Sequence, residues 1–183
     1  MTTGSWTDAL FRAAIRLGYP FARVWWHLRR PSIQGAHVIL RTRPPDLSED
    51  QILVVRNSYK PGISAPCGRL KRGERPIDGA LRELFEEVGI RLEPERLLDG
   101  GQIFLIQDGR RDHSHFFECR LEEREHPTLQ IDHREVIWAG FVPESKLSGL
   151  NLTPHLRRYL ERSDPDGRRT TSPRANTHSG SAS

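Results

Sequence analysis

Cysteine is scarce in this sequence, long apolar runs are absent, and each shortage excludes a class of protein. The two cysteines, Cys67 and Cys119, have no CxxC pair and no neighbouring histidine run, so neither a disulfide framework nor a structural zinc site is expected. No stretch approaches the roughly 18 consecutive apolar residues of a membrane-spanning helix. A secretory signal is not expected, because Asp8 and the arginines at 12, 16 and 23 interrupt the N-terminal apolar residues. These features favour an intracellular, cytoplasmic protein.

The charge of the chain is concentrated at its ends. Apolar residues make up 36% of the 183 residues, below the roughly 45–50% of ordinary globular domains, so part of the chain is expected outside any core. Residues 1–30 carry five arginines and one aspartate, and residues 163–183 carry three arginines and two aspartates, which leaves residues 31–162 at −1 of the total +4. Nucleic acid is therefore not expected as the main partner, because that function needs basic residues clustered on the folded body.

Both ends are predicted to lie outside the central domain, which is expected to span residues 31–162. Residues 1–30 are predicted to form an amphipathic helical segment that Pro31 ends. Its Trp25 and Trp26 favour packing on the following domain, and the alternative is a peripheral membrane contact through residues 6–30. Residues 163–183 contain alanine as their only apolar residue type, which predicts a disordered C-terminal tail.

Hydrophobic patterning and turn residues predict a mixed α/β domain of the α+β kind. Apolar runs predict strands at 37–41, 51–56, 101–107, 113–121 and 134–142. Helices are predicted at 77–88 and from Thr153 and Pro154 to about 161, and the Gly/Pro-rich residues 59–73 are predicted to form a loop. Because strands and helices do not strictly alternate, this order favours a mixed β-sheet flanked by helices.

One face of the predicted helix at 77–88 gathers acidic side chains. At about 100° per residue, Glu86 and Glu87 lie within about 60° of Glu83, so three carboxylates share one face beside an apolar stripe. Like charges at these spacings destabilise a helix by roughly 0.2–0.5 kcal/mol per pair, and clustered carboxylates are ligands that Mg²⁺ or Mn²⁺ prefers. This pattern alone is compatible with a metal site and also with a solvated acidic face that has Arg75 and Arg82 as neighbours.

A more specific pattern surrounds this helix. Gly68, Glu74 and the run Arg82-Glu83-Leu84-x-Glu86-Glu87-x-Gly89-Ile90 stand at fixed spacing over residues 68–90. The spacing matches the Nudix box, and the chain resembles the Nudix hydrolase family over about residues 35–160. The resemblance implies an α/β/α sandwich around a mixed β-sheet. It also implies a hydrolase that uses Mg²⁺ or Mn²⁺ to cleave a pyrophosphate bond, typically in a nucleoside diphosphate linked to another moiety.

The resemblance further implies roles for the acidic residues. Glu86 and Glu87 are the main expected metal ligands, Glu83 is a further ligand or the base that activates water, and the Gly68 carbonyl is an extra ligand. In the implied mechanism the metal lowers the pKa of bound water, and a nearby carboxylate takes the proton. Glu135 is an alternative base or ligand, unless it belongs to a surface charge run.

The remaining expected roles belong to residues around the carboxylates. By the same resemblance, Arg82 is expected to orient the neighbouring carboxylates, and Glu74 is expected to brace the loop against the helix near the metal. Lys60, Lys71 and Arg72 of the loop at 59–73, together with its backbone N–H groups, are expected to bind the substrate phosphates.

The sequence leaves the substrate and one alternative function open. Cys67 stands where the family often has glycine, and Lys71 stands where it often has an acidic residue, so the alternative is a catalytically weak nucleotide-binding or regulatory Nudix module. Residues 96–107 lack the proline that members hydrolysing ADP-ribose carry in this strand. Members that act on diadenosine polyphosphates carry a tyrosine there, but this chain has no tyrosine between Tyr59 and Tyr159. The expected partner is a small nucleotide, and a homodimer is compatible with the sequence.

Overall fold

A computed structural model describes residues 32–107, 110–122, 125, 127–131 and 133–163 of the chain. The predicted amphipathic segment at 1–30 lies outside the described residues, as does all of the predicted tail at 163–183 except Ser163. Both therefore stay predictions. None of the helices within the described ranges is long and apolar enough to cross a membrane.

A mixed β-sheet forms the centre of the domain. Its strands are β1 (Ser32–Thr42), β2 (Gln51–Asn57), β3 (Ile63–Ser64), β4 (Cys67–Arg69), β5 (Leu98–Gln107), β6 (Arg110–Arg120) and β7 (Val136–Pro143). The hydrogen-bonded order is β3-β2-β1-β6-β5, with β4 also paired to β1 and β7 to β2. β1 runs parallel to β6, and the other pairs are antiparallel. This confirms the mixed sheet predicted from the sequence.

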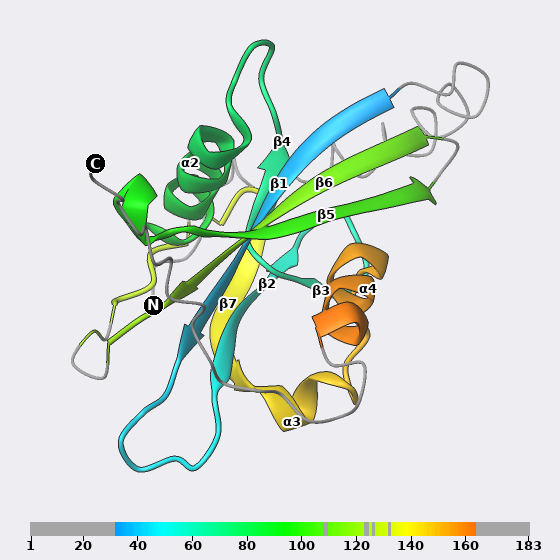
Figure 1. Cartoon of the computed structure of the whole chain (residues 1–183). Coiled ribbons are helices and arrows are strands. Elements are labelled where there is room, and N and C mark those ends of the chain that lie inside the picture. Colours follow the sequence, from blue (N-terminus) through cyan, green and yellow to red (C-terminus); the bar gives the residue numbers. More distant parts are fainter. Residues whose placement is uncertain (1–31, 108–109, 123–124, 126, 132, 164–183) are drawn as a thin grey trace, which may run out of the picture.

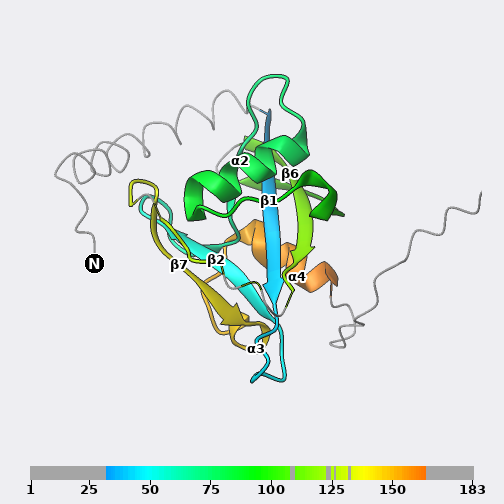
Figure 2. The same cartoon turned by 90° about the vertical axis from the view of Figure 1, so that its left-hand side faces the viewer.

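Helices cover both faces of this sheet. They are α2 (Pro76–Val88), the 3₁₀ turn η1 (Pro94–Arg96), α3 (Glu144–Leu147) and α4 (Pro154–Ser163). α2 packs on one face and α4 on the other (Figures 1 and 2). Successive side chains of β1 enter two different cores: Val38 and Leu40 pack toward α2, whereas Ile39 packs toward α4. The arrangement is the α/β/α sandwich expected from the resemblance.

The prediction was wrong within residues 59–73 and incomplete after β7. The segment predicted as a loop contains the short strands β3 and β4, and α3 was not predicted. β3 and β4 have too few residues to show an alternating pattern, and they form because neighbouring backbones pair with them. α4 begins where Thr153 and Pro154 predicted, although the buried Thr153 hydroxyl makes no capping hydrogen bond, and it ends at Ser163.

The ends of α2 follow the residues that the sequence places there. Pro76 is the first helical residue, and Gly89 ends the helix in the left-handed region at φ 75°, with its N–H donating to the Phe85 carbonyl at 2.9 Å. Inside the helix, a Cβ on Gly79 would overlap the Leu70 side chain and lie 3.1 Å from Glu74 Oε2. The glycine therefore lets the loop before α2 close directly onto the helix, despite a cost of roughly 1 kcal/mol relative to alanine.

Candidate active site

Two carboxylates of α2 face the short strand β4. The Glu83 carboxylate lies so close to Gly68 that a Cβ on this glycine would overlap it. One turn further along, the two carboxylate oxygens of Glu87 accept hydrogen bonds from the Cys67 N–H at 2.9 Å and from Asn57 Nδ2 at 3.4 Å. Glu83 and Glu87 are four residues apart, which places them on the same helix face. The structure thus brings Gly68, Glu83 and Glu87 together.

Arg82 connects these acids to their neighbours. Its Nη1 donates to Glu83 Oε1 at 2.6 Å and to Glu86 Oε2 at 3.0 Å. Its Nε and Nη2 donate to the two oxygens of Glu74 at 2.8 and 3.0 Å, and Nη2 also donates to the Arg69 carbonyl. A single guanidinium therefore holds three carboxylates in place between the loop and the helix.

Glu74 ties the loop before α2 to the helix. Besides the paired hydrogen bonds from Arg82, its Oε2 accepts the Lys71 N–H at 2.7 Å. The hydrogen bonds from Arg82 lower the pKa of Glu74 to about 2, so this carboxylate is ionised at any physiological pH. Glu74 lies where the sequence placed a loop-to-helix brace.

The three glutamates of α2 differ in burial. Glu87 is only 6% exposed, and burial raises its pKa well above the usual value for a glutamate. Burial also raises the pKa of Glu83, although the hydrogen bond from Arg82 opposes this shift. Glu86, by contrast, has a side chain that is 52% exposed at the outer edge of the helix. Glu83 and Glu87 are therefore the acids that an additional positive charge would stabilise most.

The candidate ligands suit a hard divalent cation in their chemistry, although their side chains are not arranged around a common point. Among the described residues, no three histidine, cysteine, aspartate or glutamate side chains are gathered closely enough to hold a metal ion. Arg82 lies between Glu83 and Glu86 and supplies the positive charge in this arrangement. All the candidate ligand atoms are oxygens, and the part-buried Glu83 and the buried Glu87 both have raised pKa values, which fits Mg²⁺ or Mn²⁺.

Cys67 does not crowd the carboxylates. Its backbone N–H faces Glu87, while its Sγ lies 3.4 Å from Ser64 Oγ of β3. Burial raises the pKa of the Cys67 thiol, so it is not a reactive thiolate. The side chain at this position therefore leaves the α2 side of β4 open.

The predicted phosphate-binding residues are separated in space. Lys71 and Arg72 are exposed in the loop between β4 and α2, whereas Lys60 is exposed between β2 and β3, with its Nζ 5.5 Å from the centre of the Tyr59 ring. Among the described residues, Lys60 makes no contact with Lys71 or Arg72. Glu135 is close enough that its charge contributes to the raised pKa of Glu83, so both candidate bases lie in one electrostatic environment.

A buried polar chain, which the sequence did not predict, lies on the α4 side of the sheet. Ser114 donates from Oγ to Asp112 Oδ1 at 3.1 Å, so its oxygen accepts the hydrogen bond from His37 Nε2, also at 3.1 Å. His155 of α4 points its Nε2 at Asp112 Oδ1 across 3.6 Å, which is too long for a hydrogen bond. His37 is the register partner of Cys67, so this histidine chain (His37, Asp112, Ser114 and His155) lies behind β4, opposite the glutamates.

Two ring nitrogens of the histidine chain have no hydrogen-bond partner among the described residues. Because His37 donates from Nε2, its Nδ1 carries a lone pair, and this buried atom has no donor facing it. The buried Nε2 of His155 also has no partner. Both rings belong to residues 7% exposed, and burial lowers the pKa of each to about 4. A histidine in an apolar strand and one in a helix gave no sequence signal of pairing, because 118 positions separate them.

The buried histidines should make the protein sensitive to acid. Each is neutral in the folded state, so stability is fully present above pH 6.5 and falls as the pH drops from about 6.5 toward 4. The loss should reach roughly 3 kcal/mol per histidine, while the raised pKa values of Glu83 and Glu87 act in the opposite direction. Urea unfolding at several pH values should show a shallower acid loss for His155→Gln than for the parent. Equal slopes would contradict this assignment.

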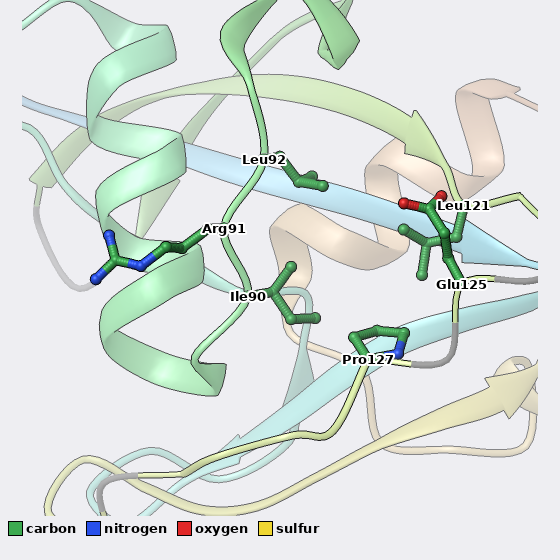
Figure 3. Close-up of a pocket in the computed structure, with 6 residues that line it drawn as sticks. All are labelled: Ile90, Arg91, Leu92, Leu121, Glu125 and Pro127. Carbon is green, nitrogen blue, oxygen red and sulfur yellow. The ribbon is translucent and has the colours of Figure 1, made fainter.

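A pocket of about 240 Å³ lies apart from the glutamates of α2. Figure 3 shows its lining by Ile90, Leu92, Leu121, Glu125 and Pro127, with the Arg91 side chain turned away toward α2. The Arg91 guanidinium instead stacks 3.5 Å from the centre of the Phe85 ring. None of the predicted site residues lines this pocket, so it is not the candidate active site.

Comparisons with known proteins identify the family and the fold of the chain. The family profile described as the NUDIX domain matches residues 36–163, whereas no curated protein sequence matches the chain. Many solved structures do match. A MutT protein from Methanosarcina mazei superposes with a TM-score of 0.62 at 20% identity, covering 76% of this chain and 97% of that one.

Two further structures were solved with bound molecules or as complexes. The Caenorhabditis elegans Ap4A hydrolase binary complex has a TM-score of 0.60 at 17% identity, covering 73% of this chain and 96% of that one. The NUDIX domain of Shewanella oneidensis NrtR, complexed with ADP ribose, has a TM-score of 0.62 at 14% identity, covering 73% and 88%. At these identities the superpositions show a shared fold, and the family profile covers most of the chain. The chain therefore belongs to the NUDIX domain family, as the motif at residues 68–90 predicted.

Proposed function

We propose that this protein is a pyrophosphohydrolase that uses Mg²⁺ or Mn²⁺ to cleave a nucleoside diphosphate linked to another moiety. Family membership supports a pyrophosphohydrolase kind of function. The observation that carries the finer proposal is a pair of carboxylates, the part-buried Glu83 and the buried Glu87, held against the backbone of β4 with raised pKa values. Removing two acids this close together from water is unfavourable unless a cation or a proton completes the site.

The proposed ligands are Glu86, Glu87 and the Gly68 carbonyl, with Glu83 as a further ligand or as the base that activates water. A bound divalent cation would neutralise phosphate oxygens and lower the pKa of a water molecule. Coordination of a cation by Glu83 or Glu86 would require Arg82 to give up its hydrogen bond to that carboxylate, because its Nη1 contacts both. Glu74 keeps Arg82 in position throughout, since its own carboxylate is ionised and doubly hydrogen-bonded to the guanidinium.

Glu83 is the proposed general base, with Glu135 as the alternative. A base works best when its pKa is near the working pH, and burial moves the pKa of Glu83 in that direction. The hydrogen bond from Arg82 Nη1 to Oε1 fixes the orientation of the carboxylate. Removal of a proton from water would therefore occur at Glu83, and Glu135 lies within reach of the same charges.

The moiety beyond the diphosphate is proposed to bind on the α4 side of β4. The exposed Lys60 lies on that side, and its charge is felt by both His37 and His155. The similarity to the Ap4A hydrolase and to the NUDIX domain complexed with ADP ribose supports nucleotides with two linked parts as the substrate class. Lys71 and Arg72 remain proposed phosphate contacts.

A cytoplasmic location is also proposed. Cys67 and Cys119 are both free thiols, and neither can pair with a second cysteine nearby. Free thiols suit a reducing compartment.

The proposal is tested by phosphate or nucleotide release from dinucleoside polyphosphates, ADP ribose, nucleotide sugars and nucleoside di- and triphosphates. We expect turnover of at least one linked diphosphate with Mg²⁺ or Mn²⁺, none with a chelator, and a loss of roughly 10²-fold or more in Glu83→Gln. Tight binding of a nucleotide without turnover under any metal condition would instead favour the alternative, a binding or regulatory module.

A further inference from the structure

One end of the sheet extends beyond both covering helices. The first residues of β1, the first residues of β6 and the last residues of β5 project past α2 and α4 (Figure 1). Register pairs place Ser32 opposite Arg111 and Arg111 opposite Ile106, while Gln34, His113 and Phe104 form the next row. Residues directly opposite one another point to the same face. We call this set the projecting face: Ser32, Gln34, Phe104, Ile106, Arg111 and His113.

The projecting face belongs to the α2 side of the sheet and carries uncovered apolar surface. The intervening residues Ile103 and Leu105 pack on the core beneath α4, so Phe104 and Ile106 must point the other way. Phe104 is 51% exposed and Ile106 is 73% exposed. The His113 ring lies against Phe104 with its centre 4.6 Å away, which extends the apolar surface across two strands. Side chains of this size are costly to leave in water.

We propose that residues 6–30 of this chain cover the projecting face. These residues enter the domain at Ser32, in the same row as Ile106. Two strand spacings separate Ser32 from Ile106, or about 10 Å. Trp26 is six residues upstream of Ser32 and so reaches at most about 20 Å from it. Pro31 disfavours helical backbone at Arg30, which allows a turn back over the sheet.

The composition of the segment supplies what the face lacks. Residues 6–30 hold large apolar side chains at helical spacing, including the adjacent Trp25 and Trp26. Tryptophan gains more from burial than any other side chain and tolerates a polar neighbour through its N–H, which suits a face that mixes Phe104 and Ile106 with Gln34. The arginines of the segment would point to solvent on the opposite stripe.

A second copy of the chain fits this surface less well. A strand added to the outer edge of β5 would need the free carbonyls of that edge, but Arg162 of α4 donates to the carbonyls of Gly100 and Gln102. The edge is therefore partly occupied by the domain itself. A helix packed on the face, rather than a strand on the edge, leaves these contacts intact.

Cysteine labelling of the full-length protein tests the proposal. Ile106→Cys is compared with Leu98→Cys, a matched control at the other end of β5 that is 64% exposed. Mass spectrometry of peptides reads the adduct at each position separately from Cys67 and Cys119. We expect a water-soluble maleimide to label position 106 about tenfold more slowly than position 98. Adding Trp25→Ala and Trp26→Ala should remove this protection, and protein concentration should not affect it.

Three outcomes would overturn the proposal. Equal labelling rates at positions 106 and 98 would show that the face is uncovered. Protection that increases with protein concentration would assign the face to a second copy of the chain. Protection that arises only when vesicles of anionic lipid are added would mean that the segment and the face meet a membrane instead.

Discussion

Replacing Gly68 with alanine should reduce metal-dependent turnover by roughly 10²-fold or more while the protein stays folded. A Cβ at this position would overlap the Glu83 carboxylate. The backbone of Gly68 is outside the left-handed region, so alanine can adopt its conformation without strain. The carboxylate must therefore move, and it carries its hydrogen bond with Arg82 Nη1 with it.

The matched control for this change is Gly149→Ala. A Cβ on Gly149 would meet only the Lys146 carbonyl at 3.6 Å, an ordinary contact, and its φ is not positive. Steady-state rates at saturating Mg²⁺ and melting temperatures should be measured for both variants. Gly149→Ala should match the parent in both. If Gly68→Ala is as active as Gly149→Ala, then the position of Glu83 against β4 has no part in catalysis.

The sequence predicted the site helix well because its information is local. The apolar stripe of α2, Pro76 at its start and Gly89 at its end are all readable within 14 residues, and each acts through backbone geometry that a short segment determines. The pattern of residues 68–90 added the family and, through it, the layers around the sheet. Both the fold class and the family were therefore within reach of the sequence.

The sequence could not separate the roles of the three glutamates. Helical geometry places Glu83, Glu86 and Glu87 on one face, but the position of β4 decides which of them are buried. The structure turns Glu83 and Glu87 toward β4 and leaves Glu86 half exposed. That outcome depends on packing between α2 and a three-residue strand whose own sequence predicted only a loop.

Longer-range contacts were also beyond the sequence. The sequence predicts Lys60, Lys71 and Arg72 in one loop, yet β3 and β4 form between Lys60 and the other two and place Lys60 apart. The histidine chain joins β1, β6 and α4, and no spacing rule relates residues so far apart in sequence. Such contacts follow from the register of the sheet, which is set by many weak preferences at once.

Substituting Glu87 or Glu86 with glutamine should separate a metal site from a merely acidic helix. Each change is nearly isosteric and removes one negative charge. If both carboxylates bind the metal, each should reduce metal-dependent turnover by roughly 10²-fold or more. Asp78→Asn is the matched control, because it removes a carboxylate from the first turn of the same helix, where Asp78 pairs with Arg75.

Stability should move in the opposite direction from activity. Without metal, each glutamine variant should be as stable as the parent or slightly more so, because each like-charge pair removed returns roughly 0.2–0.5 kcal/mol. For Glu87 the raised pKa also predicts that removing the charge does not destabilise the protein, because the buried position favours the neutral form. A glutamine oxygen can still accept the Cys67 N–H. Glu86 loses only an ion pair with Arg82 on a half-exposed side chain, which is worth little.

Melting temperatures with and without Mn²⁺ complete the test. Saturating Mn²⁺ should raise the melting temperature of the parent and of Asp78→Asn by mass action, and should raise those of Glu86→Gln and Glu87→Gln less. A solvated acidic face would show the gain in stability without metal, but it would show neither stabilisation by Mn²⁺ nor any activity to lose. Parent and glutamine variants that respond identically to Mn²⁺ would remove Glu86 and Glu87 from the proposed ligands. Glu83 and Gly68 would then have to hold the metal with other groups near β4, of which Glu135 is the first to test.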